Sequence, residues 1–149
     1  MPLKDSKKRD AYQVIEAASA DKSAGITIAK QHGNTFVTSC NNFDYIQFSN
    51  IDFGKDGTEQ LLVRLSSIQA GSSIEIVLDN VAGELLGTCT VPNTGSFDNW
   101  KTASVSIKKI KGVHDIILRF SGTNSDNLMN IDKLIFANKN QNLIDLIGK

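Results

Sequence analysis

Cysteine, histidine and proline are scarce in this sequence, each occurring only twice among 149 residues. Two cysteines are too few for a disulfide framework or a zinc cage. Cys40 and Cys89 each lie in an apolar or strand-like stretch, so we expect two free, buried thiols, with a single bridge as the alternative. The histidines, His32 and His114, are isolated in the sequence. A clustered histidine motif for a metal is therefore absent.

The sequence also lacks an excess of either charge, because sixteen basic residues balance sixteen acidic ones. Nucleic-acid binders and polybasic membrane-surface proteins need an excess of positive charge, which argues against both partners. No apolar run exceeds four residues (134–137), so no transmembrane helix is predicted. Residues 4–10 lack the apolar stretch of a signal peptide. If the natural protein is secreted, we expect this chain to be an excised piece of it.

What the sequence does contain is β-forming and turn-forming residues. Isoleucine and valine together number 24, and serine and asparagine 27. Two-residue alternation recurs over 44–48, 73–78 and 102–107, while 113–120 is a more continuous apolar run, and turn signals separate these stretches. The pattern predicts an all-β fold over residues 12–137, an antiparallel β-sandwich of the jelly-roll type. Residues 1–11 and 138–149 are expected to be polar tails, with one helical turn suggested at 143–147.

The alternation also assigns side chains to faces of the predicted strands. Ile46 and Phe48 share one face of their strand, so Tyr45 and Gln47 share the other. By the same parity, Glu75 and Arg119 are predicted to point outward on their own strands. An outer sheet face that carries aromatic, amide and charged groups is one of two places where a sandwich can bind a ligand, the other being its edge loops.

Catalytic motifs are absent. No Gly-x-Ser-x-Gly elbow, glycine-rich phosphate loop or His-Glu-x-x-His motif occurs in the sequence. Sixteen acidic residues leave a glycosidase-type carboxylate pair open, but a sandwich of this size has little room for a closed active site. We therefore expect a binding protein rather than an enzyme.

Eight stretches, in order and with intact spacing, carry a resemblance to family 6 carbohydrate-binding modules. These are the sandwich domains appended to secreted polysaccharide-degrading enzymes. Residues 41–48 resemble the family's "NGDYIxY" stretch, 51–54 its "VDFG" and 93–100 its "xTGGWQxW". The remaining stretches, which resemble its opening strand, "IEIRLD", "GxxxGTxTV", "GxHDxxL" and "FNxDWxxF", are 13–17, 73–79, 83–91, 112–116 and 130–136. The match spans about residues 12–137.

The resemblance implies a first sugar-binding cleft among the edge loops, where two aromatic rings clamp a sugar and an asparagine bonds its hydroxyls. The asparagine corresponds to Asn130, and one ring corresponds to Phe97. The position of the second ring is Ser39, which cannot stack on a sugar, although Phe36 lies close in sequence and could substitute. The alternative is that Phe97 only fills the end of the sandwich.

A second cleft, on a concave sheet face, is used by some members. Its positions correspond to Tyr45, Gln47, Glu75 and Arg119, the four residues that parity already places outward. The alternative is a solvated face with a Glu–Arg cross-strand pair. Because family members use the loop cleft more broadly, we expect the loop cleft to be slightly favoured here, with weak binding.

The family also carries a structural calcium ion. The resemblance assigns its ligands to Glu16 and Asp132, while a second acidic position of the first strand is Ala18 in this sequence. Calcium takes six to eight oxygen ligands, so losing a carboxylate is expected to weaken the site.

Together these features predict a non-catalytic module that holds an attached glycoside hydrolase near plant cell-wall polysaccharide, namely xylan, arabinoxylan or β-glucan. An extracellular location, a monomeric state and neither nucleic-acid nor membrane partners are expected. The alternative is a structural spacer whose degenerate clefts pack against its catalytic domain.

Overall fold

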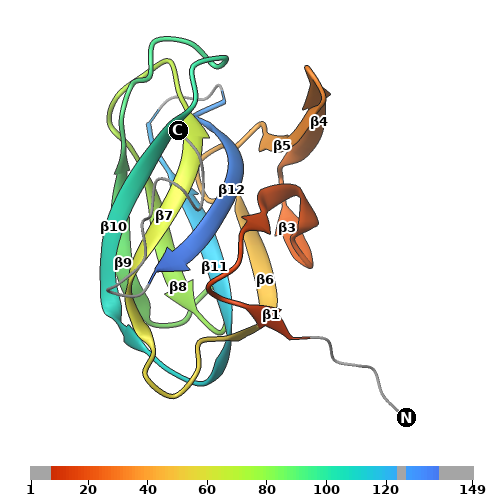
Figure 1. Ribbon diagram of the computed structural model, residues 1–149. Helices are drawn as coiled ribbons and strands as arrows, with labels where there is room; N and C mark the ends of the chain where they lie inside the picture. Colours follow the sequence, from red (N-terminus) through yellow and green to blue (C-terminus); the bar gives the residue numbers. More distant parts are fainter. Residues whose placement is uncertain (1–7, 124–126, 138–149) are drawn as a thin grey trace.

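Two β-sheets packed face to face form the protein, in a computed structural model that describes residues 8–123 and 127–137 (Figure 1). The first sheet has strand order β1-β6-β11-β8-β9, with β3 also on β6, and the second has order β10-β7-β12-β5-β4, with β2 also on β12. The strands are β1 (Arg9–Asp10), β2 (Ile15–Glu16), β3 (Lys22–Ala24), β4 (Thr27–Gln31), β5 (Asn34–Thr38), β6 (Tyr45–Asp52), β7 (Thr58–Ser66), β8 (Ser72–Leu78), β9 (Leu85–Val91), β10 (Lys101–Ile110), β11 (Val113–Ser121) and β12 (Asn130–Ala137), with one 3₁₀ turn, η1 (Ala17–Ser19). The predicted all-β antiparallel sandwich of the jelly-roll type is confirmed. No helix in the described part of the chain has the length and hydropathy needed to span a bilayer.

The core follows the predicted alternation. Ile46 and Phe48 of β6 have no exposed surface, and Val105 and Ile107 of β10 are each 5% exposed. Inward-facing residues from both sheets merge into one cluster. Within it, the rings of Phe53 and Phe136 meet edge to face, with centroids 4.8 Å apart. Burial of these two layers of side chains holds the sheets together.

A hairpin of β4 and β5 extends the second sheet and stands out from the body of the sandwich (Figure 1). Its two-residue turn is His32-Gly33, and both residues have positive φ, 54° and 77°. Positive φ at both central positions is the type I′ geometry, whose twist matches that of the flanking strands. This turn carries no strong sequence signal, because its first position is histidine instead of the usual asparagine or aspartate.

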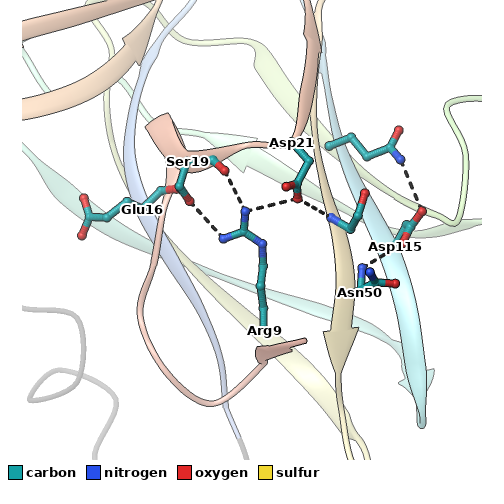
Figure 2. A network of polar contacts seen from close by, with 8 residues as sticks. Arg9, Glu16, Ser19, Asp21, Asn50 and Asp115 are labelled. Carbon is teal, nitrogen blue, oxygen red and sulfur yellow. Dashed lines mark hydrogen bonds and ion pairs between the residues drawn. The ribbon is translucent and has the colours of Figure 1, made fainter. Parts of the chain in front are cut away.

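The folded unit begins before residue 12, which corrects the expected boundary of the N-terminal tail. Arg9 and Asp10 form β1, which pairs in parallel with Ile51 and Asp52 of β6, and Ala11 is fully buried. A charged side chain of β1 connects this strand to the rest of the fold. The Arg9 guanidinium donates to the Ser19 main-chain oxygen over 2.7 Å and to Asp21 Oδ2 over 3.1 Å (Figure 2).

Residues 1–7 of the predicted polar tail at 1–11 lie outside the described residues, as does the whole of the predicted tail at 138–149 with its suggested helical turn at 143–147.

Cys40 and Cys89 are both free and buried, as predicted. Burial raises the pKa of the Cys89 thiol to about 11. Burial and, secondarily, the nearby Asp44 carboxylate raise the pKa of Cys40 as well.

Because the thiolate is the reactive form, both thiols should resist iodoacetamide in the native protein at pH 8 and react rapidly after unfolding in guanidinium chloride. Mass spectrometry of the labelled protein measures this. Rapid double labelling of native protein would contradict the burial described here.

Candidate functional site

The outer face of the first sheet carries three of the predicted sugar-binding residues in one row. Arg119 of β11 pairs in register with Tyr45 of β6 on one side and with Glu75 of β8 on the other. Its Nε donates to Glu75 Oε1 over 2.7 Å, and its Nη1 donates to the main-chain oxygen of Val81 over 2.6 Å. We call Tyr45, Gln47, Glu75 and Arg119 the sheet face. The cross-strand Glu–Arg pair expected as the alternative is therefore present.

The ion pair leaves polar atoms available to a ligand. The side chains of Arg119 and Glu75 are 27% and 29% exposed. Neither Nη2 of Arg119 nor Oε2 of Glu75 is hydrogen-bonded to another described residue, and neither is buried. The pair therefore presents one donor and one acceptor, already oriented, on the same face as a tyrosine ring. Charged groups form the stronger hydrogen bonds to neutral partners such as sugar hydroxyls.

Gln47 lies on the same face but is held by a neighbour. It is 8% exposed, and its Nε2 donates to Asp115 Oδ2 over 3.4 Å. The other oxygen of Asp115 accepts the main-chain N–H of Asn50 over 2.9 Å (Figure 2). The contacts of Asp115 with Gln47 and of Val81 with Arg119 could not be predicted from the sequence, because they depend on a strand register and a turn.

The predicted residues of the loop cleft also come together, at the end of the sandwich where β7 ends and β12 begins. Asn130 is 5% exposed, and its Oδ1 accepts hydrogen bonds from Thr38 Oγ1 (2.6 Å) and Asn127 Nδ2 (2.7 Å). Ser66, the register partner of Asn130, donates from Oγ to the main-chain oxygen of Phe97 over 2.9 Å. Phe97 is half-buried, and its main chain lies beside this pair. We call Phe97 and Asn130 the loop cleft.

The loop cleft lacks its second ring. Ser39 is half-buried and has a φ of 58°. Phe36, the substitute considered from the sequence, is only 5% exposed and packs edge-on against Trp100, with ring centroids 5.2 Å apart. The Arg64 guanidinium also lies over the Trp100 ring, 5.4 Å from its centroid. Phe36 is thus part of the packing and not an exposed sugar platform.

The residues assigned to calcium form a small network of charges. Arg64 Nη1 donates to Asp132 Oδ2 over 2.6 Å, and Lys133 Nζ lies 3.9 Å from both Asp132 Oδ2 and Glu16 Oε2. Asp132 is 1% exposed, and its Oδ1 is buried without a hydrogen-bond partner among the described residues. That oxygen suits a cation. However, the two carboxylates already face two positive side chains, and Ala18 adds no side-chain oxygen.

Other clusters that could support chemistry are not found in the described residues. No group of three or more histidine, cysteine, aspartate or glutamate side chains there could hold a metal ion. His32 is exposed in its turn, and His114 Nδ1 lies 3.2 Å from both carboxylate oxygens of Asp79. A depression of about 780 Å³ lies at the end opposite the loop cleft, and none of the predicted sugar-binding residues lines it.

Comparisons with known proteins agree with this fold. Residues 16–138 match the sequence profile of carbohydrate binding module family 6. The chain is 35% identical over 139 residues to endo-1,4-beta-xylanase A of Thermoclostridium stercorarium and 33% identical over 132 residues to arabinoxylan arabinofuranohydrolase of Paenibacillus polymyxa. These matches cover 91% and 85% of this chain but only 26% and 21% of the two proteins.

Solved structures show the same relationship. A family 6 module from Clostridium cellulolyticum, in complex with xylose, superposes with a TM-score of 0.82 at 35% identity, covering 87% of this chain and 100% of that one. A β-1,3-glucan-binding family 6 module from Bacillus halodurans gives a TM-score of 0.82 at 28% identity, covering 89% and 100%. The chain belongs to carbohydrate-binding module family 6.

Proposed function

We propose that this chain is a non-catalytic module that binds plant cell-wall polysaccharide and keeps an attached glycoside hydrolase close to it. The observation that carries the proposal is the Tyr45–Arg119–Glu75 row across three neighbouring strands. Similarity to parts of a xylanase and an arabinoxylan hydrolase supports xylan or arabinoxylan as the ligand, with β-glucan as a further candidate. Tethering acts through effective concentration, so weak affinity is sufficient.

Of the two surfaces, we place the main site on the sheet face, although the sequence favoured the loop cleft. The sheet face combines a ring with a donor and an acceptor that are already oriented. The loop cleft has one ring, and both hydrogen bonds to Asn130 Oδ1 come from the protein itself. The loop cleft is the one whose family pattern clamps a sugar between two rings, so with a single ring it loses roughly half of its stacking area, at about 25 cal/mol per Å² of apolar surface.

Electrophoresis in native gels that contain soluble xylan, arabinoxylan or mixed-linkage β-glucan tests the binding proposal. We expect retardation relative to a polysaccharide-free gel in at least one of the three, while bovine serum albumin migrates equally in all. Equal migration of the chain in every gel would overturn the proposal. Release of reducing sugar from xylan would instead reveal catalysis.

The second candidate function is a spacer that packs against its catalytic domain through degenerate clefts. The loss of the clamp ring at Ser39 and the engagement of Glu75 by Arg119 favour it. A spacer would not be retarded in any polysaccharide gel, whereas the binding module would be, so the same gels separate the two candidates.

The location and assembly state follow from the proposed role. A module that targets cell-wall polysaccharide acts outside the cell, on the same polypeptide as its hydrolase. We propose a monomer that has a polysaccharide as its ligand. Nucleic-acid and membrane partners are not proposed, because the formal net charge is zero.

We propose that Asp132 and Glu16 bind a structural calcium ion weakly. Since Arg64 and Lys133 already balance the two carboxylates, chelation by EDTA should lower the melting temperature by no more than about 4 °C, equivalent to about 1 kcal/mol. Differential scanning calorimetry of calcium-loaded protein with and without EDTA measures the shift. A loss several times larger would show a strong site, and no shift at all would remove calcium from the proposal.

A further inference from the structure

Phe43 is exposed and backbone-strained at the same time. Its side chain is 78% exposed, more than any other large apolar residue in the described part of the chain. Its φ is 75°, in the left-handed region that glycine adopts readily and that a side chain with a Cβ disfavours. In the family stretch "NGDY", the corresponding position is glycine. The chain therefore keeps a ring where the backbone favours glycine and where the ring gains almost no burial.

The strain arises from a β-bulge at the start of β6. Phe43 donates its main-chain N–H to the Phe120 oxygen, and Phe120 donates its own to the Asp44 oxygen, each over 2.9 Å. Two residues of one strand thus oppose one residue of the other, with the first at positive φ. This is the G1 arrangement, in which the first position is ordinarily glycine.

The turn that carries Phe43 is fixed from several sides. Asp44 donates its N–H to the Asn41 oxygen, and Asp44 Oδ2 accepts the Asn41 N–H, both over 3.0 Å. The side chain of Asn42 accepts the Gly122 N–H over 3.1 Å. The backbone beneath the ring is therefore ordered, so ligand contact would not require the turn itself to become ordered first.

The position of the bulge connects Phe43 to the sheet face. Tyr45 lies two residues further along the chain, and it begins the row with Arg119 and Glu75. Strained residues that persist without a packing benefit are found at functional sites. Exposed aromatic rings offer the flat apolar face on which the C–H face of a sugar stacks.

We infer that Phe43 is a sugar-stacking residue at the rim of the sheet face, where it contacts a second sugar unit beyond the one at Tyr45. This inference rests on the proposed function. The ligand class is a β-linked polysaccharide chain long enough to span both rings.

The Phe43→Gly variant separates a binding role from a structural one. Glycine relieves the strain at positive φ, so the melting temperature should stay unchanged or rise slightly, while the affinity for the polysaccharide falls about five- to tenfold. Phe43→Trp should retain the affinity. Ile28→Ala, which removes an apolar side chain that is 47% exposed on β4, should leave it unchanged.

Affinity electrophoresis with soluble xylan, arabinoxylan and mixed-linkage β-glucan, together with melting temperatures of all variants, provides the readout. If the unmodified chain is retarded and Phe43→Gly is retarded equally, the inference is wrong while the proposed function stands. If the unmodified chain is not retarded in any gel, both fail. An equal loss of affinity in Ile28→Ala would also overturn the inference, because the effect would then not be specific to Phe43.

Discussion

Replacing Tyr45 by alanine should weaken polysaccharide binding about tenfold or more, since it removes the ring that begins the row with Arg119 and Glu75. Replacing Glu75 by glutamine should have a similar effect for a different reason. The substitution removes the charge that orients the Arg119 guanidinium through the 2.7 Å bond to its Nε, and it weakens the acceptor offered to sugar hydroxyls. Dissociation constants from affinity electrophoresis at several polysaccharide concentrations measure both effects.

The matched variants lie in the loop cleft. Phe97→Ala and Asn130→Ala should leave binding within about twofold of the unmodified chain, provided that their melting temperatures show that both are folded. Asn130 is buried and accepts two hydrogen bonds, so the folding of the Asn130→Ala variant must be checked separately. If the loop-cleft variants lose binding while Tyr45→Ala and Glu75→Gln keep it, the site lies in the loop cleft, as the family pattern first suggested.

Replacing Arg64 by methionine should destabilise the fold by about 3 kcal/mol, because it removes the nearer cation of a buried carboxylate and leaves only Lys133, 3.9 Å away. The Asp132 carboxylate is 1% exposed, and its Oδ2 accepts the 2.6 Å bond from Arg64. Methionine keeps much of the apolar stem of Arg64 and removes the guanidinium, which lies 5.4 Å from the Trp100 ring centroid. A change of this size should lower the melting temperature by about 6 to 12 °C in a chain of this length.

Two comparisons distinguish the lost ion pair from lost packing. Lys108→Met breaks an ion pair of similar length, 3.1 Å, whose side chains are 65% and 55% exposed, so it should change stability little. Adding Asp132→Asn to the Arg64→Met variant removes the buried charge that has lost its nearer partner and should recover part of the loss. A melting temperature that is unchanged in Arg64→Met would contradict the account of this pair.

Much of the fold could be predicted because it rests on side-chain alternation. Period two in residues 44–48 correctly placed Ile46 and Phe48 in the core and Tyr45 on the outer face. Strand β1, which the sequence did not predict, depends on long-range polar contacts. The sequence around Arg9 reads as a charged tail, yet its guanidinium reaches Ser19 and Asp21 and fixes β1 beside β6.

For the candidate site, the sequence could predict which side chains share a sheet face but not which neighbours engage them. Parity placed Tyr45, Glu75 and Arg119 outward, and strand register then brought them into one row. Two further features became apparent only in the three-dimensional structure. Phe36 is buried against Trp100 rather than exposed to a ligand, and Phe43 occupies a bulge at positive φ. Neither burial nor φ can be read from residue identity, although phenylalanine in place of the motif glycine was visible in the sequence.

Titration of the ¹⁵N-labelled chain with xylohexaose, followed by heteronuclear NMR, tests the central claim most directly, because it reports on both surfaces in the unmodified protein. The account predicts that the largest chemical-shift changes occur at the amides of Phe43, Tyr45, Glu75 and Arg119, with smaller changes at Phe97 and Asn130. Changes confined to residues 92–100 and 127–130 would contradict the sheet-face site. An absence of changes with xylohexaose, and likewise with oligosaccharides of arabinoxylan and β-glucan, would contradict sugar binding by this chain altogether.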